Sequence, residues 1–540
     1  MKFRLQLVVV NDSGYEQMQE MARLERAGVE METLGLTLAE GKLVLKRIQE
    51  VMVEEQVNDH VAQRRSCPDC GGARHGKGHN DITVRTLFGN VEVKSPRLEH
   101  CPCQPHEEKS FSPLQKVLPE HTSPELLYLE VKWGSLVPYE VSCDLLHEVL
   151  PVDQKLSAVT IRNHLFEVAE RMENELGQER SCLIEGCEQD WEQLPIPDGP
   201  LTVGLDGGFV RARHKRGCFE VIVGKSILEF KRKDEEEAEK SKKCFGFVQT
   251  FDEKPRRRLF ELLKAQGMAM NQQVTFLSDG GDDVRQVQQY LSPEAEYWLE
   301  WFHITMRITV MKQMAKGLAA ETKTPTKADS EPAAGPKREL DKELQSLKWN
   351  LWHGNVDRAL ERIKDLQWEL ELMAGDTEKR DKLLKQVREF DGYIRNNREF
   401  IPNYGERYRN GERISTAFVE STVNQVVSKR MVKKQAMQRT ERGAHLLLQT
   451  RTRVLNGELE ETFRRWYPKF RPQLPAEAKA AAQSPEFLVL STPTVAITES
   501  NEERFRKSMG KIPEPGRLRS GRYTAIGPMS QRMRHEHGRR

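Results

Sequence analysis

The stretch LTVGLDGGFVRAR at 201–213 is an apolar run that ends at Asp206 and continues into two glycines and several arginines. Two more runs rich in Val, Ile and Phe follow it, CFEVIVGKSIL at 218–228 and KCFGFVQTF at 243–251. Segments of this composition, bounded by turn residues, predict strands. Farther along, the pattern predicts a helix at 255–267, a strand VTFLS at 274–278, a helix at 282–291 and a fifth strand in YWLEWFH at 297–303.

Three antiparallel strands followed by alternating helices and strands are the element order of an RNase H-like α/β core. We therefore expect a multidomain α+β protein in which such a core is interrupted by an all-helical insertion. The expected segments are a helical region at 1–63, a zinc-ribbon-like domain at 64–120, a helix-turn-helix region at 121–198, the first part of the core at 199–318, a linker at 319–338, the helical insertion at 339–410, the C-terminal helices of the core at 411–470, and a basic, disordered tail at 471–540.

Two aspartates occur in matching settings, each at the end of an apolar strand and before a pair of glycines. They are Asp206 and Asp279, the latter in TFLSDGGDD. A carboxylate in such a place is costly unless it is paired, and a divalent metal would pair it. Asp-Gly is also a common turn dipeptide, so a plain turn is the alternative for each aspartate taken singly.

A third carboxylate, Glu420 in STAFVESTVNQ, lies far downstream on a predicted helix, between apolar neighbours and before a basic segment. Separated carboxylates of this kind can converge on paired divalent metals that act on phosphodiesters. Glu300 and His303, three residues apart at the end of the fifth strand, could support such a site. The alternative for this pair is a packed aromatic strand end with a hydrogen-bonded histidine.

Four cysteines form two close pairs, Cys67 with Cys70 and Cys101 with Cys103, on either side of a segment that alternates like a hairpin. Two such pairs can close a tetrahedral thiolate site for structural Zn²⁺. Coincidental free thiols are the alternative. The chain has nine cysteines, an odd number, and no export signal is evident, which argues against a disulfide framework.

Two predicted helices at 136–151 and 156–172 are joined by a short polar turn, with Ser157 as the N-cap of the second. Arg162, Asn163 and His164 are expected to point outward, where a helix-turn-helix reads DNA bases. Simple packing of two amphipathic helices is the alternative.

The net charge is only +2, but residues 429–453 carry eight Lys or Arg and a single acid, Glu441. This stripe predicts contact with nucleic-acid phosphates, and Lys429, Arg430, Lys433 and Lys434 are its first members. No apolar run approaches the roughly 18 residues that a membrane span requires. We therefore expect a cytoplasmic, nucleoid-associated protein without a membrane partner.

Several long blocks resemble the bacterial ISKra-type insertion-sequence transposases: LDGGFVRAR, FEVIVGK, LSDGGDDVR, LEWFHITMRITVM, LKWNLWHGNV and VESTVNQVVSKRMVKKQAM. The resemblance implies an acidic triad at Asp206, Asp279 and Glu420, with Mg²⁺ or Mn²⁺ as cofactor. The related C/DxxH motif of Mutator-like transposases falls on Glu300 and His303, and the family has Asp where this chain has Glu300.

The activity implied is cleavage and strand transfer of double-stranded DNA, at transposon ends and at a target, by a homo-oligomer in a synaptic complex. Two other functions remain open on the residues: an RNase H-like nuclease, and an inactive or domesticated transposase-derived DNA-binding regulator.

Overall fold

The computed structural model describes residues 1–10, 14, 16–103, 109–178, 193–195, 201–227, 242–281, 295–320, 336–373, 377–415, 417–432 and 438–472. The chain divides into the units Met1–Pro472 and Gln473–Arg540, so every described residue belongs to the first. It is a mixed α+β protein. No described helix combines the length and the apolar character needed to cross a membrane.

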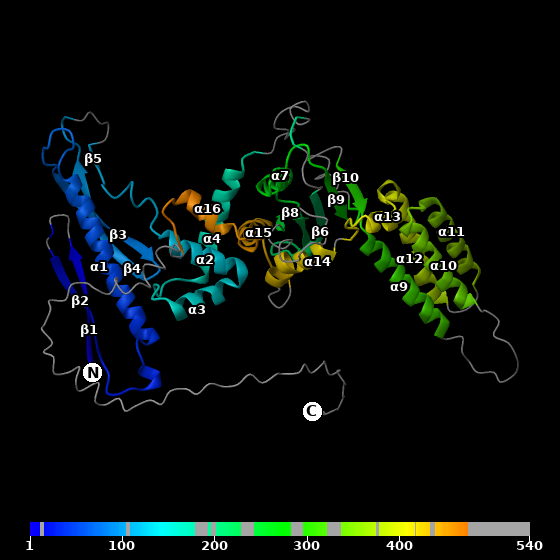
Figure 1. Ribbon diagram of the computed structural model, residues 1–540, viewed down its shortest axis with the longest axis horizontal. Helices are drawn as coiled ribbons and strands as arrows, with labels where there is room; N and C mark the ends of the chain where they lie inside the picture. Colours follow the sequence, from blue (N-terminus) through cyan, green and yellow to red (C-terminus); the bar gives the residue numbers. More distant parts are fainter. Residues whose placement is uncertain are drawn as a thin grey trace, which may run out of the picture. The chain divides into compact units, whose positions relative to one another are not determined.

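A five-stranded sheet organises the middle of the chain (Figure 1). Its strands are β6 (Leu201–Arg211), β7 (Cys218–Ile227), β8 (Lys243–Val248), β9 (Val274–Ser278) and β10 (Glu296–Leu299), in the order β10-β9-β6-β7-β8. Strands β6, β7 and β8 are antiparallel, whereas β9 pairs in parallel with both β6 and β10. All five predicted strands are therefore confirmed. Helix α7 (Pro255–Ala265) is confirmed as well, and the helix predicted at 282–291 lies outside the described residues.

Helices cover both faces of this sheet, because successive side chains of a strand project to opposite sides. On one face, Val203 and Leu205 of β6 belong to an apolar cluster with Leu259 and Leu263 of α7. On the other face, Val210 joins a second cluster with residues of η3 (Asn424–Val432) and α15 (Glu441–Leu455). Asp206 is an even-numbered residue like Val210, so the pleat places it on this second face. The short helix α14 (Ala417–Val423), which carries Glu420, contacts β6 and β7 and appears beside β6 in Figure 1.

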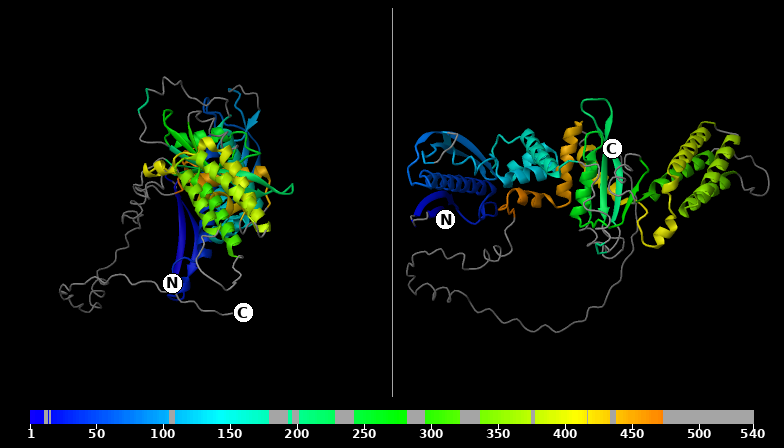
Figure 2. Two further views of the ribbon diagram at one scale, coloured as in Figure 1. Left: turned by 90° about the vertical axis from the view of Figure 1, so that its right-hand side faces the viewer. Right: turned by 90° about the horizontal axis from the view of Figure 1, so that it is seen from above.

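Four helices form a bundle between β10 and α13 (Tyr404–Arg409) in sequence: α9 (Trp301–Ala320), α10 (Pro336–Trp352), α11 (Val356–Leu372) and α12 (Thr377–Asn396). Figure 2 shows them packed side by side, and α12 returns to contact α9. Their core is aliphatic, with Leu347, Ile363 and Leu366 fully buried. The helices predicted for 339–410 are confirmed. The predicted linker is shorter than 319–338, because α9 runs to Ala320 and α10 begins at Pro336.

The first 25 residues are a β-hairpin, so the prediction of a helical region over 1–63 is wrong at its start. Strands β1 (Lys2–Val10) and β2 (Glu16–Glu25) pair in antiparallel fashion. The signal is the alternation of Phe3, Leu5, Leu7 and Val9, which places apolar side chains on one face of a strand. Helix α1 (Leu38–Arg64) follows a short η1 turn (Met31–Thr33) and starts with a capping box between Thr37 and Glu40.

The cysteine region and the helices after it have the expected types. Strands β3 (Gly76–Thr86) and β4 (Gly89–Glu99) form the predicted hairpin, extended by β5 (Ser110–Phe111). Helices α2 (Pro124–Leu136), α3 (Tyr139–Val149) and α4 (Ala158–Leu176) come next, and Ser157 caps α4 by accepting a hydrogen bond from the Thr160 N–H. A short η2 turn (Arg398–Phe400) precedes α13, and α16 (Leu459–Trp466) is the last described helix.

Candidate active site at the ends of the central strands

Three acidic residues lie in step across three adjacent strands: Asp206 within β6, Asp279 directly after β9 and Glu300 directly after β10. In the parallel pair β6–β9, Gly204 is opposite Leu277, so two residues onward Asp206 falls opposite Asp279. In the pair β9–β10, Ser278 is opposite Leu299, so the next step brings Asp279 beside Glu300. Neighbouring strands are about 4.8 Å apart, so these three residues form a row across the sheet. Asp279 and Glu300 follow the carboxyl ends of β9 and β10, whereas β6 continues beyond Asp206 to Arg211, so the prediction that Asp206 ends its strand is wrong.

Glu420 reaches the same row because two glycines of β6 let α14 lie directly on the sheet. A Cβ atom built on Gly204 would lie 2.2 Å from Cγ2 of Val419, and one on Gly208 would lie 3.2 Å from Cγ1 of Val423. Asp206 sits between these glycines on the same face of the strand. Gly208 thus accommodates a helix, whereas Gly207 faces the Glu220 side chain.

The electrostatics of Asp206 show that these carboxylates are close enough to affect one another. Burial raises the pKa of Asp206 to about 6, against the opposing effect of the Gly207 N–H, which donates to Oδ1 at 2.8 Å. The negative charges of Asp279, Glu420 and Glu220 are smaller causes of the same rise in pKa. A cation placed among the carboxylates would reverse that effect, because it favours the ionised form of each.

The carboxylates of the acidic row are spaced more widely than the ligands of a single metal ion. Among the described residues, the only groups of three or more His, Cys, Asp or Glu whose ligand atoms all lie within 4.8 Å of one another are the four cysteines and a set made of Glu173, Asp252 and His445. Asp206, Asp279 and Glu420 are not such a group. Two divalent ions about 4 Å apart would span a wider set of carboxylates than one ion does.

The turn that carries Asp279 is held by α12 of the helical bundle. The Tyr393 hydroxyl donates to the Asp279 carbonyl oxygen at 2.9 Å, and the Asp279 carboxylate accepts from the Gly281 N–H at 3.2 Å. Gly280 has a φ of +97°, and a Cβ there would lie 2.7 Å from Oδ1 of Asn397. The bundle therefore fixes the backbone of one member of the acidic row.

Glu300 and His303 contact each other at the edge of this site. Glu300 is only 1% exposed, and its Oε1 meets Nδ1 of His303. Burial lowers the pKa of His303, while the charges of Asp279 and Glu420 oppose that shift. His303 thus lies near the triad, and the buried Glu300 contacts its ring.

The four predicted cysteine ligands come together as one cluster. The Sγ atoms of Cys67 and Cys103 are 3.5 Å apart, those of Cys70 and Cys101 are 3.4 Å apart, and those of Cys70 and Cys103 are 3.5 Å apart. Four thiolates at Zn–S distances of about 2.3 Å occupy tetrahedral corners at similar separations. The first pair is shaped as a turn, in which the Gly71 N–H donates to the Cys67 carbonyl at 2.9 Å with Gly71 at φ +70°. The cluster could therefore bind zinc.

The outward face predicted for α4 is only partly correct. Asn163 is exposed, while Arg162 is half-buried against the Phe166 ring and donates to the Asn163 side chain. His164 points inward, contrary to the prediction, and pairs with the fully buried carboxylate of Glu130 on α2. Burial lowers the pKa of His164, but this ion pair outweighs burial and raises it overall.

Half of the described members of the predicted basic stripe are buried: Arg430, Arg439 and Arg451 are buried, Lys429 and Arg442 are exposed, and Arg453 is partly exposed. Lys429 is exposed, but Arg430 is 1% exposed and donates to the Gly134 carbonyl at 3.0 Å, so its assignment as a DNA contact is wrong. Arg451 donates to the Ser135 carbonyl at 2.6 Å in the same way. Both arginines donate hydrogen bonds to carbonyl groups in the last turn of α2, and positive charge is favoured at the C-terminus of a helix. Lys433 and Lys434 lie outside the described residues.

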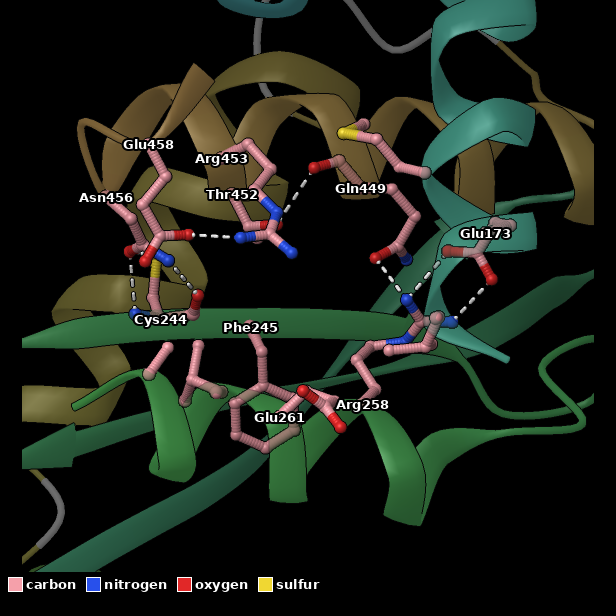
Figure 3. A pocket seen from close by; sticks show the side chains of 14 residues that line it. Glu173, Cys244, Phe245, Arg258, Glu261, Gln449, Thr452, Arg453, Asn456 and Glu458 are labelled. Atoms are coloured by element: carbon pink, nitrogen blue, oxygen red, sulfur yellow. Dashed lines mark hydrogen bonds and ion pairs between the residues drawn. The ribbon is translucent and has the colours of Figure 1, made fainter. Parts of the chain in front are cut away.

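Sequence reasoning missed a buried ionic network that joins α4, α7 and α15 (Figure 3). Arg258 donates to Glu173 at 2.7 Å, to Gln449 at 2.7 Å and to Asp252 at 3.0 Å, and His445 lies within 3.6 Å of Glu173. The guanidinium already balances these acids, so we interpret the group as a stabilising contact between helices. His445 and Gln449 are four residues apart on one helix, and that spacing was its only sequence signal.

Compared with known families and with curated proteins, the chain matches no family model and no curated protein.

Proposed function

We propose that the chain is a DDE-type transposase that binds insertion-sequence ends and catalyses Mg²⁺-dependent cleavage and strand transfer of DNA. The observation that carries this is the meeting of Asp206 and Asp279, in step on parallel strands, with Glu420 on a helix seated at Gly204 and Gly208. The sheet order, with three antiparallel strands followed by two parallel ones, supports an RNase H-like core.

The donor set suits a hard divalent cation. Asp206, Asp279 and Glu420 offer only carboxylate oxygens, which Mg²⁺ and Mn²⁺ prefer, and these residues would hold the ions. When bound, such ions activate a water or a DNA 3′-OH for in-line attack and stabilise the leaving oxygen. The raised pKa of Asp206 supports this assignment, because it reflects first the burial of this carboxyl and then the nearby charges of Asp279 and Glu420, both of which a bound cation would offset.

The other residues of the site position these ligands. The Gly207 N–H orients the Asp206 carboxylate, and Tyr393 fixes the turn of Asp279 from the helical bundle. Glu300 orients His303, whose ring lies near the charges of Asp279 and Glu420. His303 could therefore contact a scissile phosphate or a bound water, with Glu300 as its buried partner.

The proposed partners are double-stranded DNA, at transposon ends and at a target, and further copies of the chain in a synaptic complex. Self-association is supported by exposed apolar side chains of the N-terminal hairpin and of α1: Val8, Met18, Leu38, Leu45 and Met52. The cysteine cluster would hold structural Zn²⁺, and such a protein would act in the cytoplasm at the nucleoid.

The test is cleavage of the DNA that flanks the coding region on either side, with Mg²⁺ and with Mn²⁺. Asp206→Asn, Asp279→Asn and Glu420→Gln should each lower cleavage by at least about a thousandfold while leaving DNA binding within twofold, because removal of a ligand disrupts the reacting geometry. Glu399→Gln, a change of an exposed acid on the η2 turn, is the matched control.

The products separate this proposal from its alternatives. Cleavage followed by joining of the ends to a target plasmid supports a transposase. Cleavage of any duplex without joining would indicate an RNase H-like nuclease, and end binding without cleavage a regulator. Full cleavage by Asp206→Asn would overturn the metal assignment itself.

A further inference from the structure

The turn that joins β6 to β7 carries an unusual concentration of positive charge. Its exposed side chains are Arg211, Arg213, His214, Lys215 and Arg216. No acidic residue occurs between Asp206 and Glu220. The only ion pair within this group, among the residues that the structure describes, joins Lys215 to Glu441 at 2.6 Å. The turn therefore presents several cations to solvent that no carboxylate in the described ranges balances.

The backbone of this turn is anchored. The Ala212 N–H donates to the Gly217 carbonyl at 3.0 Å and closes the turn, with Gly217 at φ +110°. The Arg213 N–H donates to the Arg439 carbonyl at 2.9 Å, and the Arg439 N–H donates to the Arg211 carbonyl at 3.0 Å. Ala212 is buried in the same apolar cluster as β7 and α15. An anchored backbone presents its charges with less loss of entropy on binding than a free loop would.

Arg439, which bonds to this turn, carries a buried charge of its own. It is 8% exposed, and its Nε and Nη2 have no hydrogen-bond partner among the described residues. The pKa of Arg430 is lowered to about 10, first by burial and then by the positive charges of Arg439 and Arg451. These three guanidinium groups are therefore close enough to repel one another. Buried guanidinium groups that repel one another are costly unless an anion lies nearby. The helix C-terminus that Arg430 and Arg451 bind offsets only part of this charge.

We infer that the turn at 211–217, together with Arg439, binds the sugar-phosphate backbone of nucleic acid independently of base sequence. The inference rests on the proposed function for the identity of its ligand. The buried, unpartnered nitrogens of Arg439 point to an anion, and the exposed cations of the turn fit a ligand with a row of negative charges.

The position of the turn on the sheet fits this role. Arg211 follows Asp206 by five residues of one strand, a distance of about 17 Å, which a duplex covers in about half a helical turn. Phe209 and Arg211 are odd-numbered, so the pleat places them on the same face of the strand, opposite to the face of Asp206. Phe209 is 64% exposed, so its ring can pack against a sugar or an unpaired base of nucleic acid held by the turn. This surface takes over part of the role that the sequence suggested for residues 429–453, where Arg430 and Arg451 are buried.

The first experiment measures the salt dependence of binding. The full-length triple variant Arg211→Gln, Arg213→Gln, Arg216→Gln is compared with wild type on a 30-base-pair duplex of arbitrary sequence, without divalent ions, by fluorescence anisotropy over a series of KCl concentrations. Each lost phosphate contact lowers the slope of log K against log salt by about 0.9, so the slope should fall by about 2.7.

The matched control removes the same charge elsewhere. Arg362, Arg388 and Arg398 are exposed, and each is paired with an acid in the helical bundle. Their triple substitution by Gln should leave the slope within about 0.5 of wild type. An unchanged slope in the turn variant, or an equal fall in both variants, would overturn the inference.

A second measurement needs no charge change. A photo-crosslinking phenylalanine analogue at Phe209 should yield a covalent adduct with the duplex, whereas the same analogue at Trp368, which is 65% exposed on α11, should yield none. Equal yields at the two positions would contradict a local contact. Asp206→Asn should retain both the slope and the adduct. If Asp206→Asn instead retains full cleavage, the proposed function fails, while the binding surface is still judged by the slope and the adduct.

Discussion

Gly204 shows how one residue without a side chain can decide where a carboxylate lies. Glu420 reaches the acidic row only because α14 sits on β6, and α14 can sit there only because position 204 has no Cβ. Gly208 has the same role farther along the strand, where the helix leaves more space. The placement of the carboxylates and the packing of α14 thus depend on the same strand of the sheet.

Substituting these glycines should separate packing from chemistry. Gly204→Ala places a methyl group 2.2 Å from Val419 and should destabilise the chain by about 1–3 kcal/mol, because α14 must shift. Cleavage should fall with it, since Glu420 moves. Gly208→Ala meets Val423 at 3.2 Å, so we expect a cost below about 1 kcal/mol.

Urea unfolding and the cleavage assay together check this pair of variants. Gly392→Ala, on α12 with no heavy atom within 4 Å of the new Cβ, is the control and should be neutral or stabilising. Equal stability of Gly204→Ala and wild type would show that α14 does not rest on β6 as described.

At the scale of elements, the hairpin β3–β4 and the cysteine turns form a unit with a modest apolar core of its own. Val84, Val91, Val93 and Leu114 are its buried members with Val61 of α1. A core of this size benefits from a metal that ties its loops together. The cysteine cluster ties the turn before β3 to the residues that follow β4.

Zinc removal should therefore unfold this element and spare the central sheet. Purified protein should contain about one zinc per chain, and Cys67→Ser should lose it, because a site of three thiolates binds more weakly. Cys218→Ser, a change of an exposed cysteine outside the cluster, should retain the metal. Elemental analysis measures the zinc content, and protease cleavage between residues 64 and 120 reports the unfolding. Wild-type protein folded in this region without metal would contradict the prediction.

At the scale of the whole molecule, elements far apart in sequence are joined by buried polar contacts. The network of Glu173, Arg258 and Gln449 in Figure 3 connects α4 before the sheet with α7 and with α15 beyond the bundle. Burial would raise the pKa of Glu173, but hydrogen bonds from His445 and Arg258 outweigh it and lower that pKa to about 2. The folded state therefore stabilises the ionised form of this carboxyl.

This predicts an acid-dependent loss of stability. Because the pKa of Glu173 is depressed on folding, its contribution is fully present above its ordinary value of 4.5 and is lost as the pH falls toward about 2. The contribution is roughly 3 kcal/mol. The difference in unfolding free energy between wild type and Glu173→Gln should be constant from pH 7 to 5.5 and should narrow below pH 4.5.

Glu261→Gln provides the control for this measurement. Glu261 lines the same pocket as Glu173 and Arg258 (Figure 3), but it is partly exposed and pairs with Arg257, so its substitution should cost less than about 1 kcal/mol. If the difference in unfolding free energy between wild type and Glu173→Gln stayed unchanged down to pH 3, the network would not stabilise the fold through this charge.

The sequence by itself determined the five strands, the helices of the bundle, the Ser157 cap and the four clustered cysteines. These follow from periodicity, turn residues and spacing, all of which act over a few residues. The hairpin at 2–25 was also within reach, since its alternation was present in the sequence.

Only the tertiary structure decided which charges face solvent and which carboxylates meet. The sequence predicts His164 and Arg430 as surface residues, but in the fold both contact α2: His164 pairs with Glu130, and Arg430 donates to the Gly134 carbonyl. The step that sets Asp206 beside Asp279 depends on strand register, and the place of Glu420 depends on where α14 lies on the sheet. A local pattern specifies the two sides of a helix or strand, but the neighbouring element determines which side is buried.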